Sequence, residues 1–254
     1  MIYETHTHFD DKAFDGDREE AIKRTFDAGI GKIVNIGSSM KSSKTSLMLA
    51  QDHPDIYAAI GIHPEETKDL TEDDMAILEV YAKDENVVAI GEIGLDYYWD
   101  EPERDIQKRW FIRQIELAEK THLPIVIHSR DAAEDTLNIV KETKAETVGG
   151  IVHCFSYGTQ IAKQYLDLGF YIGVGGVVTF KNAKKLKEVV EYVPLDKIVT
   201  ETDSPYLAPI PMRGGRNSSE YLPYIVEAIA AIKGVTAEEV ENITYENAVR
   251  IFGK

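Results

Sequence analysis

The sequence contains a single cysteine, Cys154, so no disulfide can form within the chain. No apolar run approaches the roughly 20 residues that a membrane-spanning helix needs. Nothing resembles a charged stretch followed by an apolar stretch ahead of a cleavage site, the pattern of a secretion signal. These absences argue against a secreted disulfide scaffold and against a membrane protein, and we expect a cytoplasmic location.

Basic residues are also scarce. Lys and Arg together number 28 against 44 Asp and Glu, which gives a formal net charge of −16. A protein that grips duplex DNA tightly usually presents a broad basic surface that neutralises phosphates. We therefore expect any contact with nucleic acid to be local and weak.

The chain has no low-complexity tract and no linker, and its 254 residues match the size of one α/β barrel. We expect residues 1–254 to form a single domain. Short runs rich in Ile and Val alternate with amphipathic segments, as in parallel sheets whose strands are covered on both faces. The predicted strands are Ile2–His6, Lys32–Gly37, Ile56–Ile62, Val87–Ile93, Pro124–His128, Gly150–His153, Phe170–Val174 and Ile198–Thr202.

Helix start signals lie between and after these strands, with a capping-box pattern at Thr71–Asp74 and a similar one near the end of the chain at Thr236–Glu239. Eight strand–helix units predict a single (β/α)8 TIM barrel. An open doubly wound sheet is the alternative, but it expects a glycine-rich phosphate turn where the first strand instead runs into His6 and His8. The longest irregular segment, 204–219, follows the last strand and should lie over the mouth of the barrel.

Polar side chains gather at the C-terminal ends of the predicted strands, where barrel enzymes carry their active sites. His6 and His8 close the first strand and, because side chains alternate, they point to the same side. Burying ionisable groups without partners is expensive, so such a convergence indicates a metal site rather than core packing. The predicted ligands are His6, His8, Glu92, His128, His153 and Asp203.

These ligands predict a two-metal centre, because six exceed what one tetrahedral ion takes. Mixed imidazole and carboxylate donors suit zinc, manganese, magnesium or similar divalent ions. Two ions about 3.5–4 Å apart can activate a shared water and stabilise the oxygens of a phosphate ester. We expect Glu92 to bridge the ions and Asp203 to orient the water as general base. The first ion would take His6, His8, Glu92 and Asp203, and the second Glu92, His128 and His153.

The remaining histidines and the cysteine have simpler expected roles. His53 and His122 precede strands and should lie at the surface. His63 follows a strand end, where a substrate contact is expected, although a loop histidine that caps a turn would give the same pattern. Cys154 should point away from His153 and act as a small buried side chain.

Two carboxylates, Glu4 and Glu201, lie one step deeper in the barrel on the faces of His6 and Asp203. One interpretation is that they accept hydrogen bonds from ligating imidazoles and so fix the ring orientation. The other is that local twist turns them outward or pairs them with a lysine. The pattern leaves both open.

Five motifs resemble the TatD family of metal-dependent deoxyribonucleases, in the family's order from residue 2 to the final helix. They are Glu4-Thr-His-Thr-His-Phe-Asp10, Gly91-Glu-Ile-Gly-Leu-Asp-Tyr97, His128-Ser-Arg-Asp-Ala132, His153-Cys-Phe-Ser156 and Glu201-Thr-Asp-Ser-Pro-Tyr-Leu207. The resemblance implies an amidohydrolase-superfamily barrel, two divalent metal ions and hydrolysis of DNA phosphodiesters, often by exonuclease action. The chain departs from the family pattern at Glu4, where Asp is usual, at Tyr157, where Gly is usual, and after Asn217, where a Pro is missing. These departures bear on the shape of the substrate loop.

The choice of reaction depends on the fourth strand. Dihydroorotase and phosphotriesterase resemble this chain in their opening motif but bridge their metals with a carbamylated lysine, where this chain has Glu92. Arg130, with Arg213 and Arg216 as weaker candidates, offers fork-shaped donors suited to phosphate oxygens, and we expect His63 and Arg130 to bind the phosphate.

The acidic exterior favours attack on a short single-stranded DNA end, at the 3′ or 5′ terminus, over internal cutting of long duplexes. Two alternatives stay open. One is a small-molecule hydrolase of the same superfamily, acting on a lactone, amide or phosphomonoester. The other is a metal-binding protein whose catalysis is vestigial.

Overall fold

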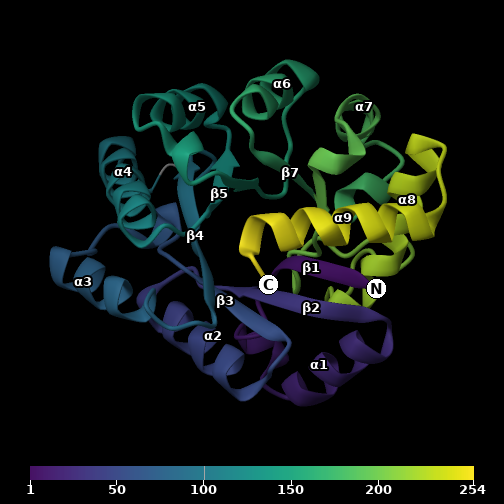
Figure 1. Cartoon of the computed structure of the whole chain (residues 1–254), viewed down its shortest axis with the longest axis horizontal. Coiled ribbons are helices and arrows are strands. Elements are labelled where there is room, and N and C mark those ends of the chain that lie inside the picture. The colour runs from purple at the N-terminus through teal and green to yellow at the C-terminus, as the bar shows by residue number, and fades with distance from the viewer. Residues whose placement is uncertain (100) are drawn as a thin grey trace.

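The computed structural model describes residues 1–99 and 101–254, and its strands form one parallel sheet in the order β1 to β8, with helices around it (Figure 1). The strands are β1 Ile2–Thr7, β2 Ile30–Ile36, β3 Ile56–Ile60, β4 Val87–Asp96, β5 Ile125–Arg130, β6 Gly150–Val152, β7 Tyr171–Val174 and β8 Ile198–Thr200. The helices are α1 Arg18–Asp27, α2 Met40–Asp52, α3 Glu72–Tyr81, α4 Arg104–Thr121, α5 Ala133–Glu142, α6 Thr159–Asp167, α7 Lys184–Tyr192, α8 Leu222–Lys233 and α9 Ala237–Phe252. The predicted (β/α)8 TIM barrel is confirmed.

The barrel closes where β1 meets β8. Among the described residues, an isolated parallel bridge between Thr7 and Ser204 stands there in place of a ladder. The buried Glu4 carboxylate lies across this join and accepts hydrogen bonds from the backbone N–H groups of His6 at 3.1 Å and Thr202 at 2.9 Å. Because buried backbone donors need partners, the carboxylate replaces part of the missing ladder. The sheet is therefore closed, and the open doubly wound alternative is wrong.

The interior of the barrel is apolar and is capped at one end by α9, which crosses that end in Figure 1. Among the described residues of this inner cluster, the buried helical members Ala248 and Phe252 both come from α9. The ring of Tyr3, near the start of β1, lies 5.9 Å from the ring of Phe252. The helix thus covers the N-terminal end of the strands and leaves the C-terminal end for a site.

Strand β4 is longer than the sequence predicted, since it continues to Asp96 instead of ending at Ile93. Gly94 makes this possible: its φ is +147°, and a Cβ at this position would lie only 1.9 Å from the carbonyl oxygen of His128. A residue without a side chain is required where two backbones approach so closely. Glu92 was expected at the C-terminal end of its strand with the other polar side chains, and this is wrong, because Glu92 lies within β4, next to β5.

The predicted helix starts at α3 and α9 are confirmed. Thr71 accepts from the backbone N–H of Asp74, whose carboxylate bonds back to Thr71, so the capping box is complete. Thr236 accepts from the N–H of Glu239 at the start of α9. None of the helices described combines the length and the apolar character that a bilayer crossing requires.

Candidate metal centre

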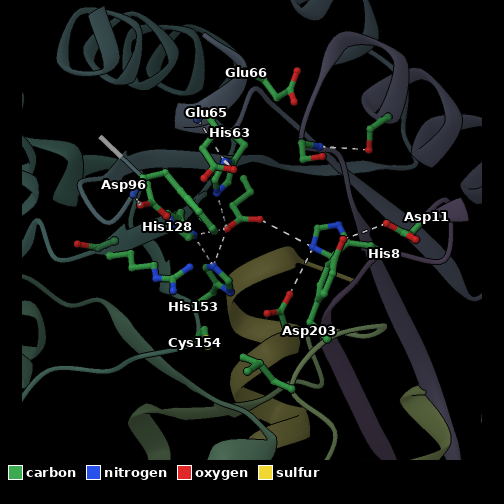
Figure 2. Close-up of a pocket in the computed structure, with 18 of the residues that line it drawn as sticks. His8, Asp11, His63, Glu65, Glu66, Asp96, His128, His153, Cys154 and Asp203 are labelled. Atoms are coloured by element: carbon green, nitrogen blue, oxygen red, sulfur yellow. Dashed lines mark hydrogen bonds and ion pairs between the residues drawn. The ribbon is translucent and has the colours of Figure 1, made fainter. Parts of the chain in front are cut away.

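The C-terminal ends of the strands surround a cavity of about 870 Å³ (Figure 2). Most residues predicted to act in a site line this cavity, namely His8, His63, Glu92, His128, Arg130, His153 and Asp203. His6 is buried directly behind them, with its ring stacked on that of His153 at 3.9 Å. The structure therefore brings together at one rim side chains that are far apart in the sequence.

Glu92 occupies the middle of this group, and its two carboxylate oxygens face different histidines. Oε1 lies 2.7 Å from Nδ1 of His128 and 2.6 Å from Nε2 of His153. Oε2 lies 3.5 Å from Nε2 of His6 and 3.9 Å from Nε2 of His8. The donors thus fall into two sets, with one oxygen of the same carboxylate in each set.

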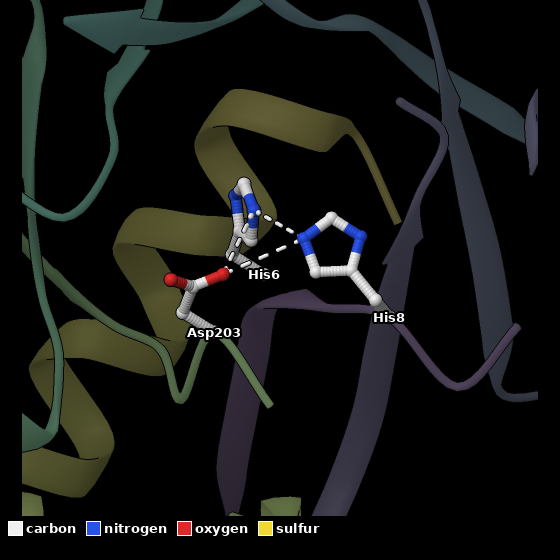
Figure 3. A group of neighbouring side chains, drawn as sticks. All are labelled: His6, His8 and Asp203. Atoms are coloured by element: carbon white, nitrogen blue, oxygen red, sulfur yellow. Dashed lines mark hydrogen bonds and ion pairs between the residues drawn. The ribbon is translucent and has the colours of Figure 1, made fainter. Parts of the chain in front are cut away.

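The set on the β1 side includes Asp203, which follows β8. Figure 3 shows His6, His8 and Asp203 turned toward one another. The Nε2 atoms of the two histidines lie 3.2 Å apart. Oδ1 of Asp203 lies 3.4 Å from Nε2 of His8 and 3.7 Å from Nε2 of His6. Ligand atoms of these three residues lie close enough to hold one metal ion.

Hydrogen bonds on the far sides of two rings fix which nitrogen faces the cavity as an acceptor. Nδ1 of His8 lies 2.9 Å from the carbonyl oxygen of Ile36, which can only accept, so this nitrogen carries a proton. Nε2 of His128 lies 3.0 Å from Oδ2 of Asp96, which likewise requires a proton on that nitrogen. In their neutral forms both rings direct a lone pair at the Glu92 cluster, as ligands of a cation must.

The electrostatics of the cluster also fit a cation. Although burial opposes ionisation, His153 and His128 hold the pKa of Glu92 well below its usual range. Burial similarly opposes ionisation of Asp203, but its bond to His8 lowers that pKa. Two ionised carboxylates thus lie among imidazole nitrogens in a largely buried cluster, a donor set that suits zinc, manganese or magnesium.

Metal loading at neutral pH should release protons. Burial disfavours the charged imidazoles, yet Asp203 raises the pKa of His8 to about 9, and Asp96 and Glu92 raise that of His128 to about 9. Without an ion both rings are therefore protonated at pH 7, whereas a ligand must be neutral, so metal affinity should rise as pH increases toward 9.

Calorimetric titration in buffers of different ionisation enthalpy would count the released protons. If the cluster holds metal, chelation should also lower the Tm, because a ligand that binds the folded state far better than the unfolded state stabilises the fold. If elemental analysis found no metal under any loading condition, the metal centre would be wrong.

His63 both caps a turn and faces the cavity, so the two interpretations of this residue are compatible. Its Nδ1 accepts the backbone N–H of Glu65 at 3.3 Å, at the start of a short 3-10 helix, Pro64–Glu66. Burial and the neighbouring His128 lower the pKa of His63 to about 3, so the ring is neutral. Since Nδ1 accepts, the proton sits on Nε2, which lies 3.9 Å from Oε1 of Glu92. His63 therefore presents a donor to the cavity.

The three candidate arginines have different surroundings. Arg130 lines the cavity, with its guanidinium 3.8 Å from the centre of the Tyr98 ring. Arg216 instead forms a two-pronged ion pair with Asp17, at 2.6 and 2.7 Å, and is therefore already engaged. Arg213 lies over Phe180. Arg130 is thus the arginine available to a ligand in the cavity.

The deeper carboxylates do not bond to the imidazoles as one interpretation predicted. Glu4 accepts backbone hydrogen bonds at the join between β1 and β8, and Oε1 of Glu201 accepts the backbone N–H of Cys154. That oxygen lies 4.0 Å from Nδ1 of His153, too far for a hydrogen bond. The outward-facing alternative is also wrong, because both carboxylates are fully buried.

Two features of the rim departed from the sequence prediction. Cys154 is partly exposed and lines the cavity, because β6 ends at Val152 and a φ of +44° breaks the strand alternation. Asp96, for which no role was predicted, accepts a hydrogen bond from the outer nitrogen of His128. Its position in the Gly91–Tyr97 motif was visible, but the length of β4 that brings it to His128 was not.

Comparisons with known proteins show what the whole chain is similar to. The family described as TatD related DNase matches residues 3–253. The metal-dependent hydrolase YabD of Bacillus subtilis (strain 168) is 46% identical over 252 residues, covering 99% of each chain. The 3′-5′ ssDNA/RNA exonuclease TatD of Rahnella sp. (strain Y9602) is 32% identical over 257 residues, covering 99% of this chain and 98% of its own. The crystal structure of YJJV, a TatD homologue from Escherichia coli K12, superimposes with a TM-score of 0.94 at 30% identity and covers 100% of this chain and 98% of its own.

Proposed function

The chain belongs to the TatD family of metal-dependent hydrolases, and from this premise we propose that it cleaves DNA phosphodiester bonds at single-stranded ends, using two divalent ions. The proposal depends chiefly on the position of the Glu92 carboxylate between two sets of donors. Its Oε2 faces His6 and His8, while its Oε1 faces His128 and His153. A carboxylate with one oxygen in each of two donor sets is suited to bridge two ions.

The proposed first site consists of His6, His8, Glu92 and Asp203, and the second of Glu92, His128 and His153. When bound, the ions would supply Lewis-acid stabilisation of phosphoryl oxygens and a nucleophile at neutral pH. Their preferred identity, zinc, manganese or magnesium, follows from the mixed donors.

The chain's own groups then have separate roles. Asp203 is ionised and borders the cavity, so it can orient the attacking water and accept its proton. The Nε2 proton of His63 and the guanidinium of Arg130 can donate to phosphate oxygens and steady the charge that develops on them. Asp96 and Ile36 hold His128 and His8 in the orientation that the sites require.

The nucleic-acid substrate is supported by the Rahnella relative, which is named as an exonuclease of single-stranded DNA and RNA. Incubation of metal-loaded protein with end-labelled oligonucleotides tests the proposal, and a ladder of successively shorter products is expected. Turnover of lactones, amides or phosphomonoesters without DNA cleavage would favour the small-molecule alternative. No hydrolysis of any of these compounds would favour a metal-binding protein with vestigial catalysis.

Salt should affect DNA affinity only weakly. With a net charge of −16, few phosphates can be neutralised by side chains. The logarithm of the association constant should therefore fall with the logarithm of salt concentration with a slope of about −1 to −3. Fluorescence anisotropy of a labelled strand across a salt series measures this slope. A value of about −8 would instead reveal many phosphate contacts, which the acidic composition does not predict.

A further inference from the structure

Two aromatic side chains at the rim of the cavity are unusually exposed. Trp99 follows β4 and is 61% exposed, and Tyr206 follows β8 and is 53% exposed. Both line the same cavity as the candidate ligands. Large apolar surface is normally removed from water, so aromatic rings that remain exposed beside a candidate active site indicate a binding surface.

The two rings lie toward opposite ends of the Glu92 cluster. Asp96 connects Trp99 to His128: its Oδ1 accepts the backbone N–H of Trp99 at 3.3 Å, while its Oδ2 lies 3.0 Å from Nε2 of His128. Tyr206 is next to His8, with ring centroids 6.3 Å apart. His128 belongs to the Oε1 set and His8 to the Oε2 set, so the aromatic residues flank the reacting centre.

Both residues are held by local contacts that do not bury their rings. The hydroxyl of Tyr206 donates to Oδ2 of Asp11 at 3.0 Å, and its carbonyl oxygen accepts from Nδ2 of the buried Asn217 at 2.6 Å. On the other side, the ring of Trp99 meets that of Tyr98 edge to face at 5.0 Å. These contacts hold the rings of Trp99 and Tyr206 in place before any ligand binds, and they leave part of each ring exposed.

The side chains of the cavity supply little positive charge to hold a polyanion beyond the reacting phosphate. Besides the candidate ligands, the cavity is lined by the carboxylates of Asp10, Asp11, Glu65, Glu66 and Asp96. Among the described residues of its lining, Arg130 is the sole Lys or Arg. Away from the proposed ions, a strand of nucleic acid that enters therefore benefits from an attraction that does not depend on phosphate charge, and nucleobase stacking on aromatic rings provides one.

We propose that Trp99 and Tyr206 are stacking positions for two unpaired nucleobases, one on each side of the bond that is cut, an inference that rests on the proposed function. Both bases must leave a helical stack to reach the rings, so the substrate class is an unpaired strand and not a duplex. Because every base has a flat face, recognition should tolerate any sequence. Each stack should raise affinity by roughly 10-fold to 100-fold.

Tryptophan fluorescence tests the proposal without requiring turnover. The chain has two tryptophans, and Trp110 is only 4% exposed, so a base that reaches a ring should quench Trp99 selectively. Mg²⁺-loaded protein would be titrated with a phosphorothioate oligothymidylate, which resists hydrolysis, and with a deoxyribose-phosphate chain of equal length that lacks bases. Saturable quenching by the first and not by the second is expected, and Trp99→Phe should abolish the quenching while keeping affinity. Equal binding of both strands would overturn the proposal.

Kinetics on hydrolysable single-stranded DNA provide the second readout. Trp99→Ala should raise KM by roughly 10-fold to 100-fold while kcat changes little, because stacking contributes equally to the bound substrate and the transition state. Tyr192→Ala is the matched control, since Tyr192 is 47% exposed but lies at the end of α7, away from the cavity.

If wild-type protein cleaves DNA and the Trp99 and Tyr192 variants behave alike, the stacking proposal is wrong and the proposed function stands. If wild-type protein cleaves no DNA, the proposed function fails, and the stacking proposal fails with it. Trp99 fluorescence that changes with protein concentration in the absence of DNA would assign this face to a second copy of the chain and would also overturn the proposal.

Discussion

Replacing Glu92 with glutamine should nearly abolish hydrolysis and weaken the binding of both ions. The amide keeps the shape of the side chain but loses the negative charge that lies between the two histidine sets. One of its two groups becomes an NH2 donor, which cannot act as a ligand on that side. The fall in kcat/KM should exceed about 10³-fold, beyond the effect of removing a single charge-stabilising donor.

Metal content and steady-state rates measured on the same preparation would separate lost ions from lost chemistry. Added Mn²⁺ or Mg²⁺ should restore part of the activity if the loss is mainly one of metal occupancy. Glu188→Gln is the matched control, because it removes the same charge from an exposed position on α7. Normal DNA cleavage by Glu92→Gln with both metals in place would show that Glu92 is not the bridge.

His63→Ala should reduce kcat/KM by roughly 10²–10³-fold and leave the metal content unchanged. The neutral ring offers its Nε2 proton to the cavity, whereas the predicted ligands offer lone pairs or carboxylate oxygens, so its loss removes a donor to phosphate and no ligand.

The turn at Pro64–Glu66 also loses its capping hydrogen bond in His63→Ala, so the Tm should decrease. His63→Asn serves as the control for this effect, because asparagine can cap the turn but cannot place a donor at the position of Nε2. If His63→Ala lost its metals, the residue would be a ligand and its assignment to the phosphate would be wrong.

The fold was predictable because each buried strand appears in the sequence as a short apolar run. The residues at the rim of the barrel were predictable because side chains alternate between the two faces of a strand. His6 and His8 illustrate this, since their spacing alone places both on one face. Backbone features that break the alternation were not predictable from the same rule. Gly94 lets β4 continue beside β5, and this extension places Asp96 next to His128.

Contacts between distant segments were also beyond the sequence pattern. Arg216 was a candidate for phosphate binding until the structure paired it with Asp17, and nothing in either local sequence indicates that pair. No role was predicted for Trp99 or Tyr206 from the sequence, and their proposed role depends on their positions around one cavity. Hydrophobic periodicity reports which face of an element is buried, but not which loops meet above the barrel.

The join between β1 and β8 has a consequence for how the protein opens. Local unfolding begins where few backbone hydrogen bonds must break. Across this join the described residues form an isolated bridge, with backbone bonds from His8 to Ser204 and from Asp203 to His6, and the Glu4 carboxylate and the hydroxyls of Thr5 and Thr7 add side-chain bonds. His6 and His8 lie on one edge of this join and Asp203 on the other, so an ion bound by all three would link the two edges. The rate of amide hydrogen exchange at this join would then depend on metal occupancy. In the metal-free protein, local unfolding would begin between β1 and β8.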